Sequence, residues 1–169
     1  MKNIVLLGFM GTGKTTVAKK IAALSGMIYV STDDVIEDRE GMAIAVIFEK
    51  KGEKYFRAVE KEVISEISLR DKVVIDAGGG VVLDRDNMQS LGKKGVLVCL
   101  WADPEDIYKR TKKYATRPLL NVKDPLAAIK RLMDKRKACY EAAGYHVNTS
   151  AVGADEAAET IIGFAKRHG

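Results

Sequence analysis

Four residues near the start of the chain, Gly8, Gly13, Lys14 and Thr15, have the types and spacing of a phosphate-binding loop. Glycines let backbone N–H groups turn inward around a phosphate, because no Cβ stands in the way. The lysine offers a point charge to the β and γ oxygens of a nucleotide, and the threonine hydroxyl is a ligand for Mg²⁺. The pattern therefore predicts an ATP-binding loop. The residues predicted to contact ATP here are Gly11, Thr12, Gly13, Lys14, Thr15 and Thr16.

A magnesium ion beside such a loop usually has a second acidic group nearby. Asp33 and Asp34 follow the second predicted strand, and Asp76 ends the third. Asp34 is explained more simply as a solvated residue in the first turn of a helix. Asp76 is equally well explained as an ordinary carboxylate at a strand end. The residues alone therefore leave the acid that assists the metal open.

Three further segments could form a pocket for a phosphoryl acceptor. Carboxylates stand in STDDVIE, where the second strand meets its helix. Arg57 and Glu60 are three residues apart on one helix face, close enough to pair. A less favoured alternative is that Arg57 only forms a salt bridge with Glu60 or Glu53 on a solvated helix. Three glycines at 78–80 follow the third strand and allow the backbone to approach a ligand closely. We expect these strand ends to lie beside the phosphate loop, because the carboxyl ends of parallel strands share one edge.

Strand and helix patterns alternate along the chain, which predicts an α/β fold with a parallel sheet covered on both faces. The predicted strands span residues 3–7, 27–30, 72–75, 96–101 and 145–148. The helical spacing of apolar residues predicts helices over 14–24, 33–39, 44–50, 53–69, 84–91 and 154–166. Capping residues predict two more, one after Pro104 and one from Pro125 to about residue 143.

Composition narrows the class of protein further. A length of 169 residues fits one domain, which we expect to be a monomer. The net charge of +5 suits anionic ligands, but aromatic residues do not alternate with the basic ones, which argues against nucleic acid. No apolar stretch has the length of a membrane span and no cleavage site follows the first strand, so we expect no membrane association and a cytoplasmic location. Cys99 and Cys139 fit reduced thiols.

Several motifs in one order give the chain a resemblance to the shikimate kinase family, which has a P-loop fold like that of nucleoside monophosphate kinases. The resemblance covers nearly the whole chain and implies a three-layer P-loop NTPase fold with a five-stranded parallel sheet in the order 2-3-1-4-5. It also implies a single kinase domain over 1–169, with substrate-binding helices at about 33–62 and a lid at about 112–123. The motifs are GFMGTGKT, Asp33, FEKKGE leading to FRAVE, the glycine triplet, RPLL at 117–120, and Arg136 followed by Tyr140.

The resemblance implies transfer of the γ-phosphoryl group of MgATP to the 3-hydroxyl of shikimate, a step of aromatic amino-acid synthesis through chorismate. It implies that Asp33 orients the reacting hydroxyl, and that Arg57 and Arg136 hold the shikimate carboxylate. Lys14 and Arg117, the latter in the lid, would neutralise charge on the moving phosphoryl group. The resemblance also assigns Gly79 and Gly80 to the pocket backbone, Phe48 and Phe56 to its apolar wall, and Glu60 to orienting the arginine face.

One position departs from the family pattern. The family usually has a magnesium-assisting aspartate two residues before the position of Asp33, where this chain has Ser31. Asp76 stands at a strand end where related P-loop proteins carry such an acid. We therefore predict that Thr15 and Asp76 serve the metal, with Asp34 as the second choice.

Two kinds of alternative function remain at this stage. A kinase for another small hydroxyl compound such as gluconate would not need Arg57, Arg136 and the glycine triplet together. A regulator that binds nucleotide without catalysis would not need an acceptor pocket. A nucleotide acceptor is disfavoured, because the chain has no long insertion for a large lid.

Overall fold

The computed structural model describes residues 1–112 and 122–168. Five parallel strands form one sheet in the order β2-β3-β1-β4-β5, which confirms the predicted topology. The central strand β1 is therefore flanked by strands that come much later in the sequence. The strands are β1 (Asn3–Gly8), β2 (Ile28–Ser31), β3 (Val73–Asp76), β4 (Gly95–Trp101) and β5 (Tyr145–Asn148).

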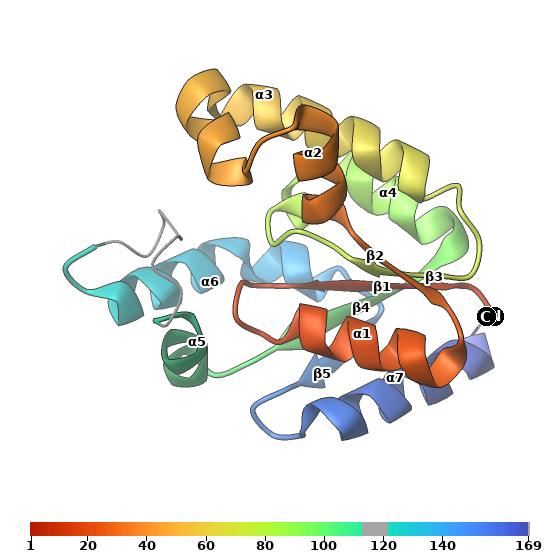
Figure 1. Ribbon diagram of the computed structural model, residues 1–169. Helices are drawn as coiled ribbons and strands as arrows, with labels where there is room; N and C mark the ends of the chain where they lie inside the picture. The colour runs from red at the N-terminus through yellow and green to blue at the C-terminus, as the bar shows by residue number, and fades with distance from the viewer. Residues whose placement is uncertain (113–121, 169) are drawn as a thin grey trace.

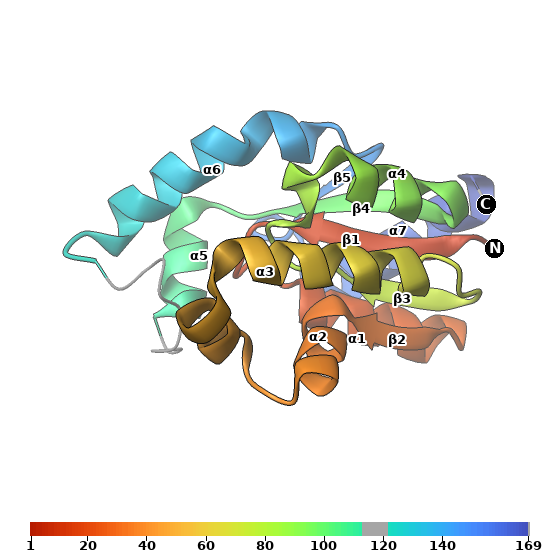
Figure 2. The ribbon, with the colours of Figure 1, turned by 90° about the horizontal axis from the view of Figure 1, so that it is seen from above.

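Helices cover both faces of the sheet, as the alternating pattern predicts. Helices α1 and α7 lie on one face, α3 and α4 lie on the other, and α5 and α6 lie near the carboxyl ends of the strands (Figures 1 and 2). The helices are α1 (Lys14–Ser25), α2 (Thr32–Glu40), α3 (Ile44–Ile67), α4 (Arg85–Lys94), α5 (Pro104–Thr111), α6 (Pro125–Glu141) and α7 (Ala154–His168), and a 3₁₀ turn spans Val81–Leu83.

Helix α3 joins two segments that the sequence predicts separately. The break expected between residues 50 and 53 is a kink at Gly52, whose φ of 80° and ψ of 168° are not helical. Glycine is the residue that adopts such a φ without a steric penalty, so the chain can bend here and continue as a helix.

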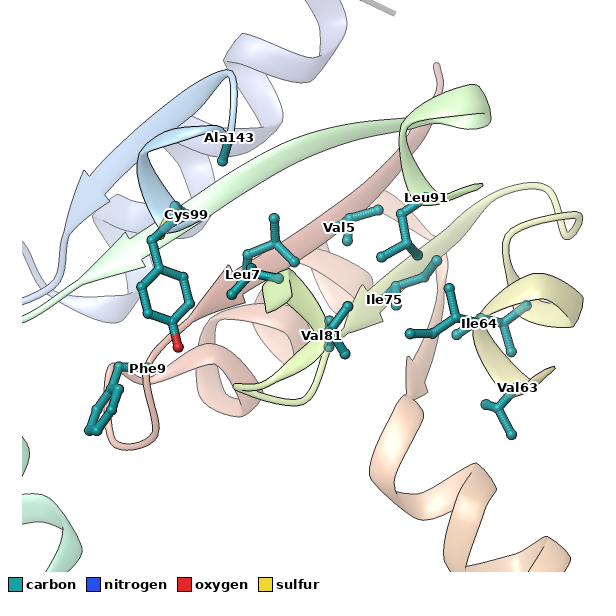
Figure 3. Packing of buried hydrophobic residues seen from close by; sticks show 14 of the residues in the cluster. Val5, Leu7, Phe9, Val63, Ile64, Ile75, Val81, Leu91, Cys99 and Ala143 are labelled. Atoms are coloured by element: carbon teal, nitrogen blue, oxygen red, sulfur yellow. The ribbon is translucent and has the colours of Figure 1, made fainter. Parts of the chain in front are cut away.

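The core has two halves because successive side chains of a strand point to opposite faces of the sheet. Every residue of β1 is buried. Val5 and Leu7 pack toward α3 and α4, whereas Ile4 and Leu6 pack toward α1 and α7. Figure 3 shows the first half, in which Val5, Leu7 and Ile75 of the sheet lie among apolar side chains of the covering elements.

The end of β1 places the phosphate loop against the neighbouring strand β4. Gly8 has a φ of 141°, and a Cβ on it would lie 2.4 Å from the carbonyl oxygen of Leu100. Only glycine allows so close an approach of two backbones, which fixes the point where the loop leaves the sheet. Among residues 1–112 and 122–168, no helix is both long enough and apolar enough to cross a membrane.

Candidate active site

The phosphate loop spans the turn from β1 to α1 and is held by its own polar side chains. The hydroxyl of Thr12 donates to the carbonyl oxygen of Phe9 at 2.7 Å. The ammonium of Lys14 donates to the carbonyl oxygens of Gly8 and Phe9, at 2.9 and 3.1 Å. Helix α1 begins at Lys14, so the positive end of its dipole and its first backbone N–H groups point into the loop. Backbone N–H groups and an ammonium at a helix start are groups that bind phosphate oxygens, so this loop remains the predicted site for the nucleotide phosphates.

Arg110 of α5 borders the loop, although its place in the sequence does not single it out. Its guanidinium donates to the carbonyl oxygen of Gly11 and to the hydroxyl and carbonyl oxygens of Thr149, each at 3.1 Å. The hydroxyl of Thr149 in turn donates to the carbonyl oxygen of Thr12 at 2.7 Å. Arg110 and Thr149 thus join the phosphate loop to the segment after β5. In the sequence Arg110 is one cation among several, so its spacing carried no usable signal.

The predicted metal residues Thr15 and Asp76 meet at the start of α1. The hydroxyl of Thr15 donates to Oδ2 of Asp76 at 2.6 Å. Asp34, the second choice, is exposed, and its backbone N–H is capped by the hydroxyl of Ser31 at 3.1 Å. Among the residues with described positions, no group of three or more His, Cys, Asp or Glu side chains could hold a metal alone. An ion here would be shared with nucleotide phosphates, which is the usual way that Mg²⁺ is held.

The glycine triplet after β3 brings the acceptor residues together. A Cβ on Gly78 would lie 2.9 Å from Oδ1 of Asp33, and one on Gly80 would lie 2.4 Å from the Arg57 guanidinium. The Cβ position of Gly79 lies 3.5 Å from the carbonyl oxygen of Gly8 in the phosphate loop. The backbone of this turn therefore lies against Asp33, Arg57 and the phosphate loop at once. Larger residues would push these groups apart.

Arg57 projects from α3 and is held by carboxylates on the same helix. It donates to Glu60 at 2.7 Å and lies 3.5 Å from Glu53, which confirms the predicted pair. Glu60 is only 2% exposed, so the ion pair with Arg57 compensates the burial of its charge. The guanidinium also lies over the ring of Phe56, 5.2 Å from the centroid, and that ring packs 4.7 Å from Phe48. The arginine is thus positioned before any ligand arrives.

Burial and neighbouring charges set the protonation of the two inner carboxyl groups. Desolvation raises the pKa of Asp33 above its usual value, while the charge of Lys14 opposes this rise and that of Asp76 adds to it. Desolvation also raises the pKa of Glu60, and the charge and hydrogen bond of Arg57 oppose it. A carboxylate with a raised pKa is a stronger proton acceptor, so Asp33 could also take the proton of the hydroxyl that it is predicted to orient.

Tyr140 connects Arg136 on α6 to the glycine triplet. Its hydroxyl donates to the carbonyl oxygen of Gly79 at 2.7 Å, and the residue is 1% exposed. Burial raises the pKa of Tyr140 to about 12, and the charge of Arg136 acts against that rise, so Arg136 lies near this hydroxyl. The structure thus brings Asp33 and Arg57 to the glycine turn and places Arg136 beside Tyr140, whose hydroxyl bonds to that turn. Arg117 and most of the predicted lid at 112–123 lie outside the described residues.

Two groups of side chains therefore share the carboxyl ends of β1, β2 and β3. One combines the phosphate loop with the carboxylate of Asp76, and the other combines a carboxylate with guanidinium groups. The second group would suit a small acceptor that has both a hydroxyl and a carboxylate. Fold and site together define a P-loop kinase that acts on a small molecule.

Comparison with known proteins identifies the family. A family model described as shikimate kinase matches residues 10–166. A shikimate kinase of Thermodesulfovibrio yellowstonii is 48% identical over 162 residues, covering 96% of this chain and 94% of the relative. One of Caldanaerobacter subterraneus subsp. tengcongensis is 46% identical over 162 residues, covering 96% and 95%. The solved structure of shikimate kinase from Acinetobacter baumannii in complex with shikimate has a TM-score of 0.93 and 35% identity, covering 99% of this chain and 94% of that one. This chain belongs to the shikimate kinase family.

Proposed function

We propose that this protein transfers the γ-phosphoryl group of ATP to the 3-hydroxyl of shikimate, giving shikimate 3-phosphate and ADP for chorismate synthesis. One observation in the structure supports this function in addition to membership of the family. The turn formed by Gly78, Gly79 and Gly80 touches Asp33, Arg57 and the phosphate loop together. An acceptor bound on this turn has its carboxylate beside a guanidinium and a hydroxyl beside a carboxylate, within reach of the nucleotide.

The side chains divide the chemistry between them. Arg57 and Arg136 bind the shikimate carboxylate, which fixes the ring and turns its 3-hydroxyl toward Asp33. Asp33 accepts the hydroxyl proton as the oxygen attacks the γ-phosphorus in line with the departing ADP oxygen. Lys14 neutralises charge that develops on the phosphoryl oxygens, and Arg117 adds a second positive charge from the lid. Catalysis thus depends on positioning and on charge more than on covalent chemistry.

Magnesium is the metal that this site fits, because the available ligands are hard oxygens. When bound, the ion neutralises charge on the β- and γ-phosphates. In our proposal Thr15 and Asp76 hold it. The hydroxyl of Thr15 gives its proton to Asp76 at 2.6 Å, which leaves an oxygen lone pair of Thr15 directed away from Asp76 for the metal.

We expect Asp76→Asn to weaken magnesium binding, because the amide carries no charge and can no longer attract the cation. The concentration of Mg²⁺ that gives half-maximal turnover should rise about 10- to 100-fold. Asp34→Asn is the matched control, since Asp34 is exposed and should leave the Mg²⁺ dependence unchanged. An unchanged Mg²⁺ requirement in Asp76→Asn would remove Asp76 from the metal site.

The proposal also includes the domain organisation, the oligomeric state and the location of the enzyme. We infer one kinase domain over 1–169 that works as a cytoplasmic monomer, with substrate-binding helices at about 33–62 and a lid at about 112–123. Two observations support it. Helices α2 and α3 carry Asp33 and Arg57 to the acceptor side. Cys99 and Cys139 are free thiols, which suits a reducing compartment.

The function is tested by measuring ADP release with shikimate, with gluconate and without an acceptor. We expect rapid release only with shikimate, because its carboxylate and ring hydroxyl match the two ends of the pocket. The phosphorylated product should be identified by mass, with its position assigned by ³¹P–¹H NMR. Equal release with gluconate would indicate a broader sugar-acid kinase. ADP release at the same rate with and without an acceptor would contradict the proposed function.

A further inference from the structure

Tyr29 of β2 contacts the carboxylate that we assign to magnesium. Its hydroxyl donates to Oδ2 of Asp76 at 3.2 Å. The same oxygen accepts the hydroxyl of Thr15 at 2.6 Å. Asp76 thus receives one hydrogen bond from the phosphate-loop helix α1 and one from the edge strand β2. None of the functional roles assigned above uses Tyr29.

The register of the sheet explains why the second bond comes from Tyr29. Asp76 pairs with Ser31 across the two strands. The hydroxyl of Ser31, however, accepts the N–H of Asp34 at 3.1 Å as the N-cap of α2. Tyr29 lies two residues earlier, so it shares the face of β2 with Ser31, and its longer side chain reaches the carboxylate. Ser31 therefore caps helix α2, and Tyr29 of the same strand supports Asp76.

One further contact restricts the side chain of Tyr29. The ammonium of Lys19 lies over the tyrosine ring, 5.3 Å from its centroid, which restricts the ring. Asp76 itself is only 8% exposed, which leaves little water to replace a lost donor.

We propose that Tyr29 is a positioning residue that holds the Asp76 carboxylate in the orientation required to bind magnesium together with Thr15. The inference rests on the function and on the metal role of Asp76 proposed above. Without the phenol hydroxyl, Asp76 would keep its charge but lose one of the two hydrogen bonds that fix Oδ2. Tyr29→Phe removes this bond and preserves the ring against Lys19.

Calorimetric titration with ADP, in the presence and absence of Mg²⁺, measures this effect without turnover. We expect Tyr29→Phe to reduce the Mg²⁺-dependent gain in ADP affinity about 10-fold, the lower end of the range for residues that orient metal ligands. ADP affinity without Mg²⁺ should match that of the parent protein, which also shows that the variant is folded. Tyr145→Phe is the matched control, because it removes the same hydroxyl from the opposite edge strand β5.

A double-variant cycle shows whether Tyr29 acts through Asp76. In an Asp76→Asn background, Tyr29→Phe should cause no further loss of the Mg²⁺-dependent gain. A full additional loss of the Mg²⁺-dependent gain in the double variant would overturn the inference. So would a Tyr29→Phe protein that keeps the parental gain while Asp76→Asn loses it. Either result would leave the proposed function standing. If Asp76→Asn keeps the gain too, both the inference and the metal role of Asp76 fail. Shikimate-dependent ADP release decides the function separately in every case.

Discussion

Asp33→Asn should lower kcat by about 10²- to 10⁴-fold, the usual contribution of a positioned general base. The amide can still accept a hydrogen bond from the substrate hydroxyl, but it cannot take the proton. Because Arg57 and Arg136 are untouched, the KM for shikimate should change much less than kcat. Steady-state kinetics with each substrate varied in turn would measure the two parameters. A loss confined to KM would indicate that Asp33 only binds the acceptor.

The same variant should be more stable than the parent protein at neutral pH. Burial raises the pKa of Asp33 in the folded state, so ionising this group costs folding free energy. That cost is absent below the unfolded pKa of 3.8 and is fully present once the pH exceeds the folded pKa. The Tm of Asp33→Asn should therefore exceed the parental Tm at pH 7 to 8, and the difference should shrink as the solution is acidified. Asp34→Asn, at an exposed position, is the control.

Lys14→Met should lower kcat by about 10²- to 10³-fold, as expected when one charged group that stabilises the transition state is removed. The Lys14 ammonium lies inside the phosphate loop, where it donates to the carbonyl oxygens of Gly8 and Phe9. Lys20→Met is the control on the same helix, because Lys20 pairs with Asp155 of α7, away from the loop. Single-turnover measurements would separate this loss from weaker nucleotide binding. A variant with the parental single-turnover rate would contradict the assignment.

Lys14→Met should also move the pH profile of the residual activity. The charge of Lys14 lowers the pKa of Asp33, so its removal lets that pKa rise further. A base must be unprotonated to act, and the acid limb of the kcat/KM profile should therefore shift to higher pH. An unmoved acid limb would mean that another group controls it.

Much of this fold follows from local sequence patterns. The apolar run of β1, the glycine loop and the helix caps each predict their structure without distant contacts. Asp124, for example, caps α6 through the N–H of Ala127 as its position before Pro125 suggests. Predicted boundaries are shifted by a residue or more where the pattern is short. Strand β2, expected over 27–30, spans Ile28–Ser31, because its register is set by pairing with β3.

The candidate site was predictable only where residues carry a distinctive type or spacing. Glycines, and an arginine paired with a glutamate on one helix face, have such a signature. The contacts of Arg110 with Gly11, and of Tyr29 with Asp76, do not, because each joins residues far apart in the sequence. Sheet order and register decide whether such residues meet. The sequence ranked Asp76 ahead of Asp34 only through the family resemblance, and the contact between Thr15 and Asp76 adds a physical reason for that order.

The central position of β1 has a consequence for how the chain is made. A ribosome releases β1 first, yet both of its neighbours in the sheet, Val73–Asp76 and Gly95–Trp101, follow far behind it. At about 5–20 residues per second, this apolar strand waits several seconds for its partners. Gly8 itself rests on Leu100, so the nucleotide cradle is completed late in translation. A nascent chain that stops before β4 therefore has an unpaired apolar strand for chaperones to cover and no finished cradle through which ATP could stabilise it.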